Sequence, residues 1–562
     1  KKGGTQRDYL SDFPRTVRTF GPNSTSSGFR QYLVDDTGMA WATRHPNVGG
    51  FYPGLAEKWA VDMDNNRVFV KINPKATWSD GHPVTSEDAL FTFYIRTSDY
   101  SEAPFGKNHF NNVYKNVTIY DDHTFSVTLN EKKPDLDYHV LSFSPQPRHA
   151  YYEFGPDFIQ RFNWRPVPVT GPYEIAPDGI KKGKSITLVR NDNWWAKDNK
   201  FFRNRFNPDE IVIKVIRDPQ KMNESFKAGD LEMSSLNLTK SWYQEVPDDH
   251  PDVVNGYINK YIFWNQIPRS NFGLWINRSK PVLDNVHVRR GIQYASNFDL
   301  VIEKFHRGDW DRLTSTSVGF GDMSFPQPVR EFSPEKAMEE FAKAGYDQFG
   351  PDGILMNAQG QRLSFTVTTG YKTLADGLTI LKQEAIKAGL ELNLEVLEWT
   401  TSSKKTSEKK HEIAFKGLSP FPSEIYPRYH SHWHSSMAFN EDGSIKQNTN
   451  NFTQTAIDEL DPLIMKYRQS LDHDEKQELA QQMEKILYDD ASWVPGAIPF
   501  KFRWGSWRWV KWPEDLNLKK AMNHASTWVH WIDEAEREET LQAMKDGKTF
   551  PKVIREETKY KP

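Results

Sequence analysis

Hydrophobic and polar positions alternate along the first third of the chain. The segment 67–72 reads RVFVKI, with apolar residues at 68, 70 and 72, and a period of two is typical of a half-buried strand. The segments 114–120 and 124–129 predict two more strands around the turn 121–123. Thr85 is a suitable N-cap for a helix with acidic residues in its first turn. This part is therefore predicted as strands and turns with occasional helices.

From about Val288 onward, the pattern changes to alternating helices and strands. Ser333 and Pro334 predict a helix start, and Gly345 predicts its end. A strand over 363–369, a helix over 374–385 that stops at Gly389, and a strand over 390–397 then follow in order. Strand, helix and strand of these lengths form a βαβ unit, which predicts a parallel or mixed α/β sheet. Helical spacing predicts three further helices, over 288–295, 460–467 and 479–486.

Length and charge narrow the class of protein. The 562 residues exceed what one hydrophobic core supports, so we expect two or three domains. Hydrophobic residues make up 37%, charged residues 26%, and the net charge is −3, which is typical of a soluble globular protein. The densest basic run, 404–410, is interrupted by Glu408 and favours a solvated loop. We therefore expect no nucleic-acid partner.

The chain contains no cysteine. Thiol catalysis, cysteine-ligated zinc and disulfides are therefore excluded, and an oxidising compartment is compatible with the composition. No run approaches the roughly 20 apolar residues that span a bilayer. The chain starts at Lys1 and not at a methionine, so we expect a mature chain that has lost its targeting segment.

Catalytic motifs are missing, whereas aromatic residues are abundant. There is no Gly-x-Ser-x-Gly, His-Glu-x-x-His or phosphate-binding loop motif, and we expect neither an enzyme nor a cofactor. The 19 Trp, 22 Tyr and 35 Phe residues can line a binding cleft or fill large cores.

Ordered blocks of residues carry a family resemblance. Gly54–Trp59 together with Ala76–Asp88, which includes Trp78-Ser79-Asp80-Gly81, resembles the signature of the extracellular solute-binding proteins of family 5. That family includes oligopeptide-, dipeptide- and nickel-binding proteins of ABC importers. Further blocks follow in the family's order at 171–173, 186–195, 226–232, 271–277 and 286–292. The stretch 206–211 and the Trp-rich end resemble the branch that handles peptide-like antibiotics such as microcin C.

This resemblance implies an α/β, bilobal periplasmic-binding-protein fold of type II, in the large three-subdomain peptide-binding class, with a hinge between the lobes. Lobe I is expected to combine 1–49, 169–277 and 497–562, with an extra subdomain over 50–168. Lobe II is expected over 278–496. The ligand is expected between the lobes, and closure around it excludes water.

The resemblance also implies a function. The chain is expected to be a monomer in the periplasm that captures an oligopeptide or modified peptide and delivers it to an ABC permease in the inner membrane. Two alternatives stay open: the same role for an oligosaccharide, which aromatic rings would suit, and a carbohydrate-active enzyme with two acids at a cleft.

One expected ligand contact departs from the family pattern. In peptide-binding relatives an acidic residue after a Gly-Trp-like segment captures the free amino terminus of the peptide. The matching segment here includes Gly417, Leu418, Ser419 and Phe421 and carries no aspartate. Either Glu424 replaces that acid from a shifted loop, or the ligand has no free amino terminus there, because an unpaired buried ammonium costs several kcal/mol.

Other candidate ligand contacts come from position relative to the family's cleft. Trp399, at the end of a predicted strand, is expected there, and the loop 20–26 is expected to present main-chain and small polar groups to the ligand. The remaining candidates are Asn23 and Ser24 of that loop, and Trp242, Trp264 and Trp275 near the crossover between lobes.

The chain also holds one metal-like histidine group. His430, His432 and His434 are spaced by two, so on a strand all three would share one face. Because no fourth ligand has suitable spacing, a polar loop is the favoured interpretation, and no metal site is assigned.

Overall fold

The computed structural model describes residues 1–24 and 28–561 and divides into two compact units. Unit 1 combines Lys1–Asn265 with Lys501–Pro562, and unit 2 is Gln266–Phe500. The sequence predicts that the chain crosses between the lobes after residue 277 and again after residue 496. The first crossing lies earlier because β13 (Gly273–Ile276) pairs with two strands of unit 2, β19 (Ile413–Lys416) and β20 (Trp493–Pro495). The separate subdomain over 50–168 stays a prediction.

Unit 1 contains three four-stranded sheets, two strand pairs and seven α-helices among the described residues. The sheets are β1 (Thr5–Leu10), β10 (Glu210–Val215), β9 (Ser185–Arg190) and β8 (Tyr173–Lys181); β4 (Ala56–Asp62), β5 (Arg67–Ile72), β7 (Thr124–Leu129) and β6 (Tyr114–Asp121); and β11 (Met233–Ser235), β22 (Lys501–Trp507), β12 (Ile258–Trp264) and β25 (Ile554–Glu557). The pairs are β2 (Ala42–Arg44) with β3 (Phe51–Pro53) and β23 (Val510–Lys511) with β24 (Trp531–Ile532). The helices are α1 (Ser86–Thr97), α2 (Pro104–Val113), α3 (Leu136–Leu141), α4 (Phe158–Arg161), α5 (Pro219–Lys227), α6 (Pro251–Val254) and α15 (Glu534–Asp546).

The predicted strands and helix cap of the first third are confirmed. β5 and β7 have the predicted bounds, and β6 extends one residue further. Thr85 caps α1 in a capping box in which its main-chain N–H donates to the Asp88 carboxylate at 2.9 Å.

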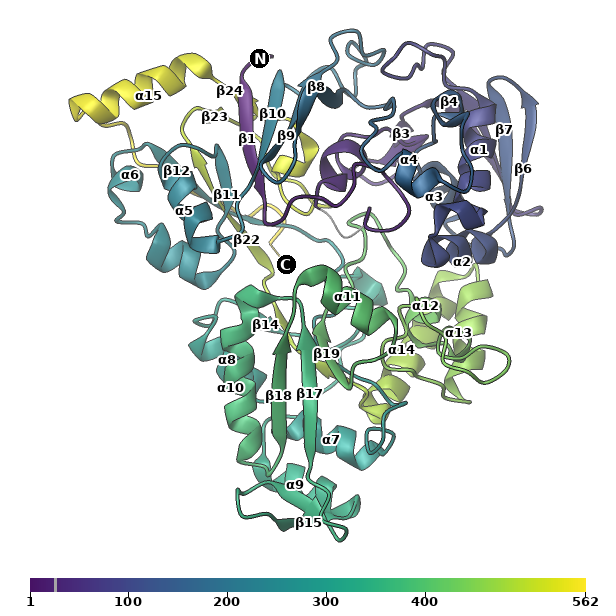
Figure 1. Ribbon diagram of the computed structural model, residues 1–562, viewed down its shortest axis with the longest axis vertical. Helices are drawn as coiled ribbons and strands as arrows, with labels where there is room; N and C mark the ends of the chain where they lie inside the picture. Colours follow the sequence, from purple (N-terminus) through teal and green to yellow (C-terminus); the bar gives the residue numbers. More distant parts are fainter. Residues whose placement is uncertain (25–27, 562) are drawn as a thin grey trace. The chain divides into compact units, whose positions relative to one another are not determined.

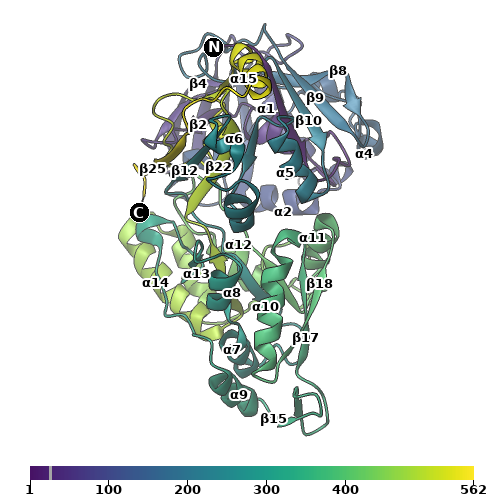
Figure 2. The ribbon, with the colours of Figure 1, turned by 90° about the vertical axis from the view of Figure 1, so that its left-hand side faces the viewer.

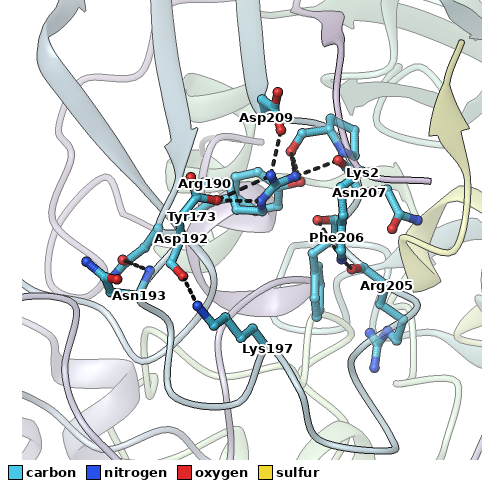
Figure 3. Close-up of polar contacts among 12 residues, drawn as sticks. Lys2, Tyr173, Arg190, Asp192, Asn193, Lys197, Arg205, Phe206, Asn207 and Asp209 are labelled. Carbon is cyan, nitrogen blue, oxygen red and sulfur yellow. Dashed lines mark hydrogen bonds and ion pairs between the residues drawn. The ribbon is translucent and has the colours of Figure 1, made fainter.

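A half-buried arginine at the end of β9 binds the loop that precedes β10 (Figure 3). The Arg190 guanidinium, at the end of β9, donates to the carbonyl of Asn207 at 2.6 Å and forms an ion pair with Asp209 at 2.6 Å. Its side chain is 16% exposed, so these charge-assisted bonds are largely shielded from water. These bonds join the end of β9 to the loop at 207–209. They therefore connect the blocks 186–195 and 206–211, both of which carry the family resemblance.

Unit 2 is built on a mixed five-stranded sheet with the order β18-β17-β19-β13-β20. β17 (Ser364–Thr369) pairs in parallel with β18 (Glu391–Val396) and β19 (Ile413–Lys416), whereas β13 is antiparallel to β19 and to β20 (Trp493–Pro495). The predicted βαβ unit is therefore confirmed, with α10 (Ala375–Ile386) as its helix. Two short pairs complete the unit, β14 (Asp311–Arg312) with β21 (Ala497–Ile498) and β15 (Tyr346–Phe349) with β16 (Leu355–Asn357).

Helices cover both faces of this sheet. Trp275 and Ala414 face a core filled by α12 (Tyr429–Trp433), α13 (Leu460–Gln469) and α14 (His473–Asp490). On the other face, α10 runs beside β18 and α8 (Phe298–Lys304) beside α10 (Figure 2). α7 (Val286–Ala295), α9 (Pro334–Lys343) and α11 (Trp399–Ser407) complete the unit. The five helices predicted after Val288 are all present, and among the described residues no helix is both long and apolar enough to cross a membrane.

Gly291 makes the packing of α7 against α9 testable. A Cβ at this position would lie 2.3 Å from the ring of Phe341, which is fully buried in α9. Gly291→Ala is therefore expected to lower the free energy of unfolding by roughly 1–3 kcal/mol through overpacking, measured as a lower melting temperature. The matched control is Gly106→Ala in α2, where the nearest atom would be 3.9 Å away and helix propensity adds at most about 1 kcal/mol. Equal melting temperatures for the two variants would contradict the packing described here.

Candidate ligand-binding site

The carboxyl ends of three parallel strands meet at one edge of the unit 2 sheet. β17 is followed by Gly370 and Tyr371, β18 by α11, which begins at Trp399, and β19 by Gly417. Figure 1 shows α11 at this end of β17 and β18. Open α/β sheets bind ligands outside the carboxyl ends of their strands. This edge, which carries Trp399 and the predicted segment 417–421, is therefore the candidate site.

Aromatic rings join the strand ends at this edge. The ring of Tyr371 lies 5.0 Å from that of Trp399 and 4.7 Å from that of Phe272, which precedes β13. Such edge-to-face contacts add about 0.5–1.5 kcal/mol each beyond burial. Trp399 is nevertheless 41% exposed, so it is both positioned by Tyr371 and open to a ligand.

Gly417 brings the main chain close to the start of β13. A Cβ at this position would lie 2.2 Å from the Ser270 hydroxyl oxygen and 2.5 Å from the ring of Phe272. Only glycine allows this approach without displacement of its neighbours. The next residue, Leu418, donates its main-chain N–H to the side-chain oxygen of Asn271 at 2.9 Å. Gly417 and Leu418 are therefore held in a defined position.

The segment borders a hollow of about 370 Å³, part of which is open solvent. Its lining combines two guanidinium groups, an imidazole, hydroxyl groups and apolar side chains: Arg269, Asn271, Thr316, Phe320, Leu418, Ser419, Pro420, Pro427, Arg428, Tyr429, His432 and Trp433. A few polar groups among apolar and aromatic ones are typical of small-molecule sites.

The ionisable groups of the hollow are positive or neutral. Burial lowers the pKa of Arg269 to about 10, with Asp311 opposing the shift, so its guanidinium stays charged at neutral pH. Burial and then the charge of Arg428 lower the pKa of His432 to about 3, which leaves this imidazole neutral. Its Nε2 atom is enclosed and has no hydrogen-bond partner among the described residues. The hollow thus favours a neutral or anionic ligand group.

Glu424 does not offer a free carboxylate to this edge. It is 7% exposed and accepts hydrogen bonds from the Arg428 guanidinium, at 2.8 Å from Nε, and from the main-chain N–H of Phe421 at 3.1 Å. Arg428 also lies over the ring of Phe421, 5.4 Å from its centroid. The Glu424 carboxylate therefore stabilises the loop in which it lies. Phe421, in the same loop, is 59% exposed.

The other predicted contacts are placed elsewhere. Trp275 is fully enclosed in the unit 2 core, where it stacks on Trp433 and donates to the carbonyl of Lys416 at 3.0 Å. Trp242 is buried in unit 1 beneath the ammonium group of Lys260, and Trp264 donates to Glu556.

The N-terminal loop also lies in unit 1. Asn23 is exposed with φ of 64°, and Ser24 is buried and donates to the carbonyl of Gly21 at 2.8 Å. Thr25 and Ser26 lie outside the described residues. Ligand contact by any of these positions stays a prediction.

The side chains of His430, His432 and His434 do not point to one common face, as they would on a strand. Residues 429–433 form α12, where spacing by two separates side chains around the helix. His430 and His434 stack at 4.7 Å, whereas His432 is buried beside Trp275. The prediction of a polar loop here is therefore wrong in its conformation, since a short helix begins directly at Tyr429.

The sequence did not single out Arg269, Phe272 and Tyr371, and it indicated His432 only as a member of the metal-like histidine group. Tyr371 follows a correctly predicted parallel strand by two residues, so the strand-end rule alone could have selected it. The other three depend on which strand neighbours β19, for which the sequence carries no local signal.

Comparison with known proteins agrees with this geometry. The model of the bacterial extracellular solute-binding proteins, family 5 (middle), matches residues 50–440, and the chain belongs to this family. Family 5 consists of extracellular substrate-binding proteins. The bilobal binding-protein fold is shared by the oligopeptide-binding protein AppA of Bacillus subtilis, solved with a nonapeptide, at a TM-score of 0.77 and 18% identity over 95% of this chain and 99% of that one.

The matches to two curated relatives span less than two thirds of those relatives' own length. A putative binding protein of Brucella suis is 27% identical over 64% of this chain, and the match spans 63% of that relative. The peptidoglycan-binding protein YepA of Agrobacterium fabrum is 30% identical over 47% of this chain and 43% of its own length.

Lys416, directly before Gly417, predicts a pH dependence of stability. Its ammonium group lies 3.5 Å from the centre of the Phe452 ring, and burial lowers the pKa of Lys416 to about 7. The unfolded chain therefore binds more protons between pH 7 and about 10.5, so stability rises with pH across that window. Lys416→Met is expected to raise the melting temperature at pH 7 by several degrees, with the difference shrinking towards pH 10.5.

The exposed Lys404→Met serves as the control for this prediction, since its side chain is 75% exposed. It should change the melting temperature little at any pH. A difference between wild type and Lys416→Met that stays constant from pH 7 to pH 10 would contradict the assignment.

Proposed function

We propose that this family 5 solute-binding protein captures a peptide-like ligand at the strand-end edge of unit 2 and delivers it to an ABC permease of the inner membrane. It acts as a periplasmic monomer. The edge suits this role because it combines the exposed aromatic faces of Trp399 and Phe421 with a rigid main-chain segment at Gly417. Main-chain groups can bind peptide bonds, and aromatic faces contact side chains or sugar rings.

The state of Glu424 narrows the ligand class. Its carboxylate is satisfied by Arg428 and by the main chain of Phe421, and the ionisable groups that line the hollow are cationic or neutral. A free ammonium group would meet charge repulsion here and lack a partner. We therefore propose a peptide whose amino end is blocked.

Peptidoglycan fragments have this chemistry, because their stem peptides are joined to the glycan through the amino end. The relative named peptidoglycan-binding protein YepA supports this ligand class. Such a fragment carries both a peptide and a sugar acid, and the exposed rings of Trp399 and Phe421 suit the latter through stacking.

A matched pair of peptides tests the proposal. The same short peptide is prepared with a free amino end and with an acetylated one, and each is titrated while the melting temperature is followed. The blocked form should bind at least about tenfold more tightly and give the larger shift, since ligands stabilise by mass action. Tighter binding of the free amine would contradict the ligand class. Shifts produced by neutral oligosaccharides and by neither peptide form would contradict the peptide function.

Exposed rings at the edge should contribute to affinity. Phe421→Ala and Trp399→Ala are each expected to weaken binding of the acetylated peptide by about fivefold or more, since removal of a contacting aromatic residue costs upward of about 1 kcal/mol. Phe349→Ala is the matched control, because Phe349 is 60% exposed in β15 of the same unit and lies outside the proposed site. Equal dissociation constants for all three variants, measured by calorimetry, would remove the edge as the binding surface.

A further inference from the structure

Three potential metal ligands converge on the surface of unit 1. The Asp80 Oδ2 atom lies 2.8 Å from Nε2 of His149 and 3.2 Å from Nδ1 of His82. All three donor atoms lie within 4.8 Å of one another. The two imidazole rings stack at 4.1 Å with an angle of 17° between their planes, so both rings present a nitrogen to the same carboxylate oxygen.

A tight turn holds the first two ligands. The main-chain N–H of Trp78 donates to the carbonyl of His82 at 2.8 Å, and Gly81 at φ of 88° allows the reversal between them. The main-chain N–H of His82 also donates to Asp80 Oδ1 at 3.2 Å. This bond occupies one carboxylate oxygen and leaves Oδ2 facing the histidines. Burial opposes the charged form, but the hydrogen bonds from His149 and His82 hold the pKa of Asp80 below its ordinary value.

The third ligand, His149, is connected to the turn through Asp88, which lies in the first turn of α1. Asp88 accepts the indole N–H of Trp78 at 3.2 Å through one oxygen and the main-chain N–H of Arg148 at 2.9 Å through the other. Asp88 therefore connects the turn to the short 3₁₀ helix Arg148–Tyr151, which carries His149. The ring of His149 also meets Trp78 edge-on at 6.2 Å. Such outer hydrogen bonds orient metal ligands before the ion arrives.

The spacing fits a tetrahedral ion. Zn²⁺ binds imidazole nitrogen and carboxylate oxygen at about 2.0–2.1 Å, which places neighbouring ligand atoms about 3.3 Å apart. The two carboxylate–imidazole separations, 2.8 and 3.2 Å, are close to this value. The two imidazole nitrogens lie within 4.8 Å of each other, and one ring has to rotate out of the stack for both to point at a single ion. His82, Asp80 and His149 are 58%, 35% and 27% exposed, so a water molecule can supply the fourth ligand.

From this geometry we propose that Asp80, His82 and His149 form a binding site for Zn²⁺ that fastens the turn 78–82 to the 3₁₀ helix 148–151. Two imidazoles and one carboxylate favour a borderline divalent ion such as zinc over the hard ions Mg²⁺ and Ca²⁺, which prefer oxygen ligands. The ion bridges segments that lie 67 positions apart in the sequence, from His82 to His149. The site is independent of the proposed peptide ligand.

Zinc titration of the untagged, full-length protein after removal of metal by a chelator tests this proposal. Calorimetry should give one Zn²⁺ per chain in the micromolar range, and zinc should raise the melting temperature. The double variant His82→Gln/His149→Gln should lose the binding by more than about tenfold, since even outer partners of a metal ligand contribute roughly 10–100-fold. Because both histidine side chains are partly exposed, the double variant without metal should have the same melting temperature as the wild-type protein without metal.

His473→Gln is the matched control, because Nε2 of His473 also lies 2.8 Å from an aspartate oxygen, that of Asp322, but belongs to no group of three potential metal ligands in the part of the chain that the structure describes. It should bind zinc as the wild type does. Co²⁺ adds a second readout, since a tetrahedral site gives an intense visible absorption band that the double variant should lack. Wild-type protein that binds no zinc at micromolar concentrations, or a double variant that binds it equally, would overturn the proposal and leave the cluster as a hydrogen-bonded ion pair.

Discussion

The parallel pairing of β17 with β18 and β19 is the constraint on which the candidate ligand site depends. Parallel strands require crossover connections, and each crossover leaves its strand at the same edge. Here that edge receives Tyr371, Trp399 and Gly417 from three separate connections. β13 enters from the opposite direction, so Phe272 completes the ring contacts at the same edge. An antiparallel arrangement of the same strands would separate these residues.

Close approach of main chains then turns the edge into a surface of defined shape. Gly417 lies so close to Ser270 and Phe272 that a Cβ atom would clash with both. The indole N–H of Trp275 donates to the carbonyl of Lys416. The fully buried Trp275 thus contributes through the main chain that it supports. Rigid elements beneath a binding segment reduce the entropy that ligand binding must overcome.

The charged side chains at this edge are cationic or held in an ion pair. The nearest carboxylate on the segment, Glu424, pairs with Arg428 four residues later, and the two together position Phe421. The residues that line the hollow include Arg269, Arg428 and the neutral His432, and none of them is acidic. Glu424, which the sequence offered as one alternative to the missing aspartate, is thus bonded to Arg428 and to the main chain of Phe421, and the ligand's amino end stays a prediction.

The sequence by itself determined the local elements and the family. Alternation at 67–72, the cap at Thr85 and the strand–helix–strand pattern over 363–397 are short-range patterns, because the side-chain period of a strand or helix and the chemistry of a cap are set within a few residues. Ordered blocks such as Ala76–Asp88 also identified family 5. Tertiary structure decided which strand neighbours which, and hence that Tyr371 meets Trp399 and that His82 meets His149 from 67 positions away. Such contacts depend on the packing of distant segments, so no local pattern encodes them, and the helix at 429–433 formed where spacing alone suggested an extended or loop conformation.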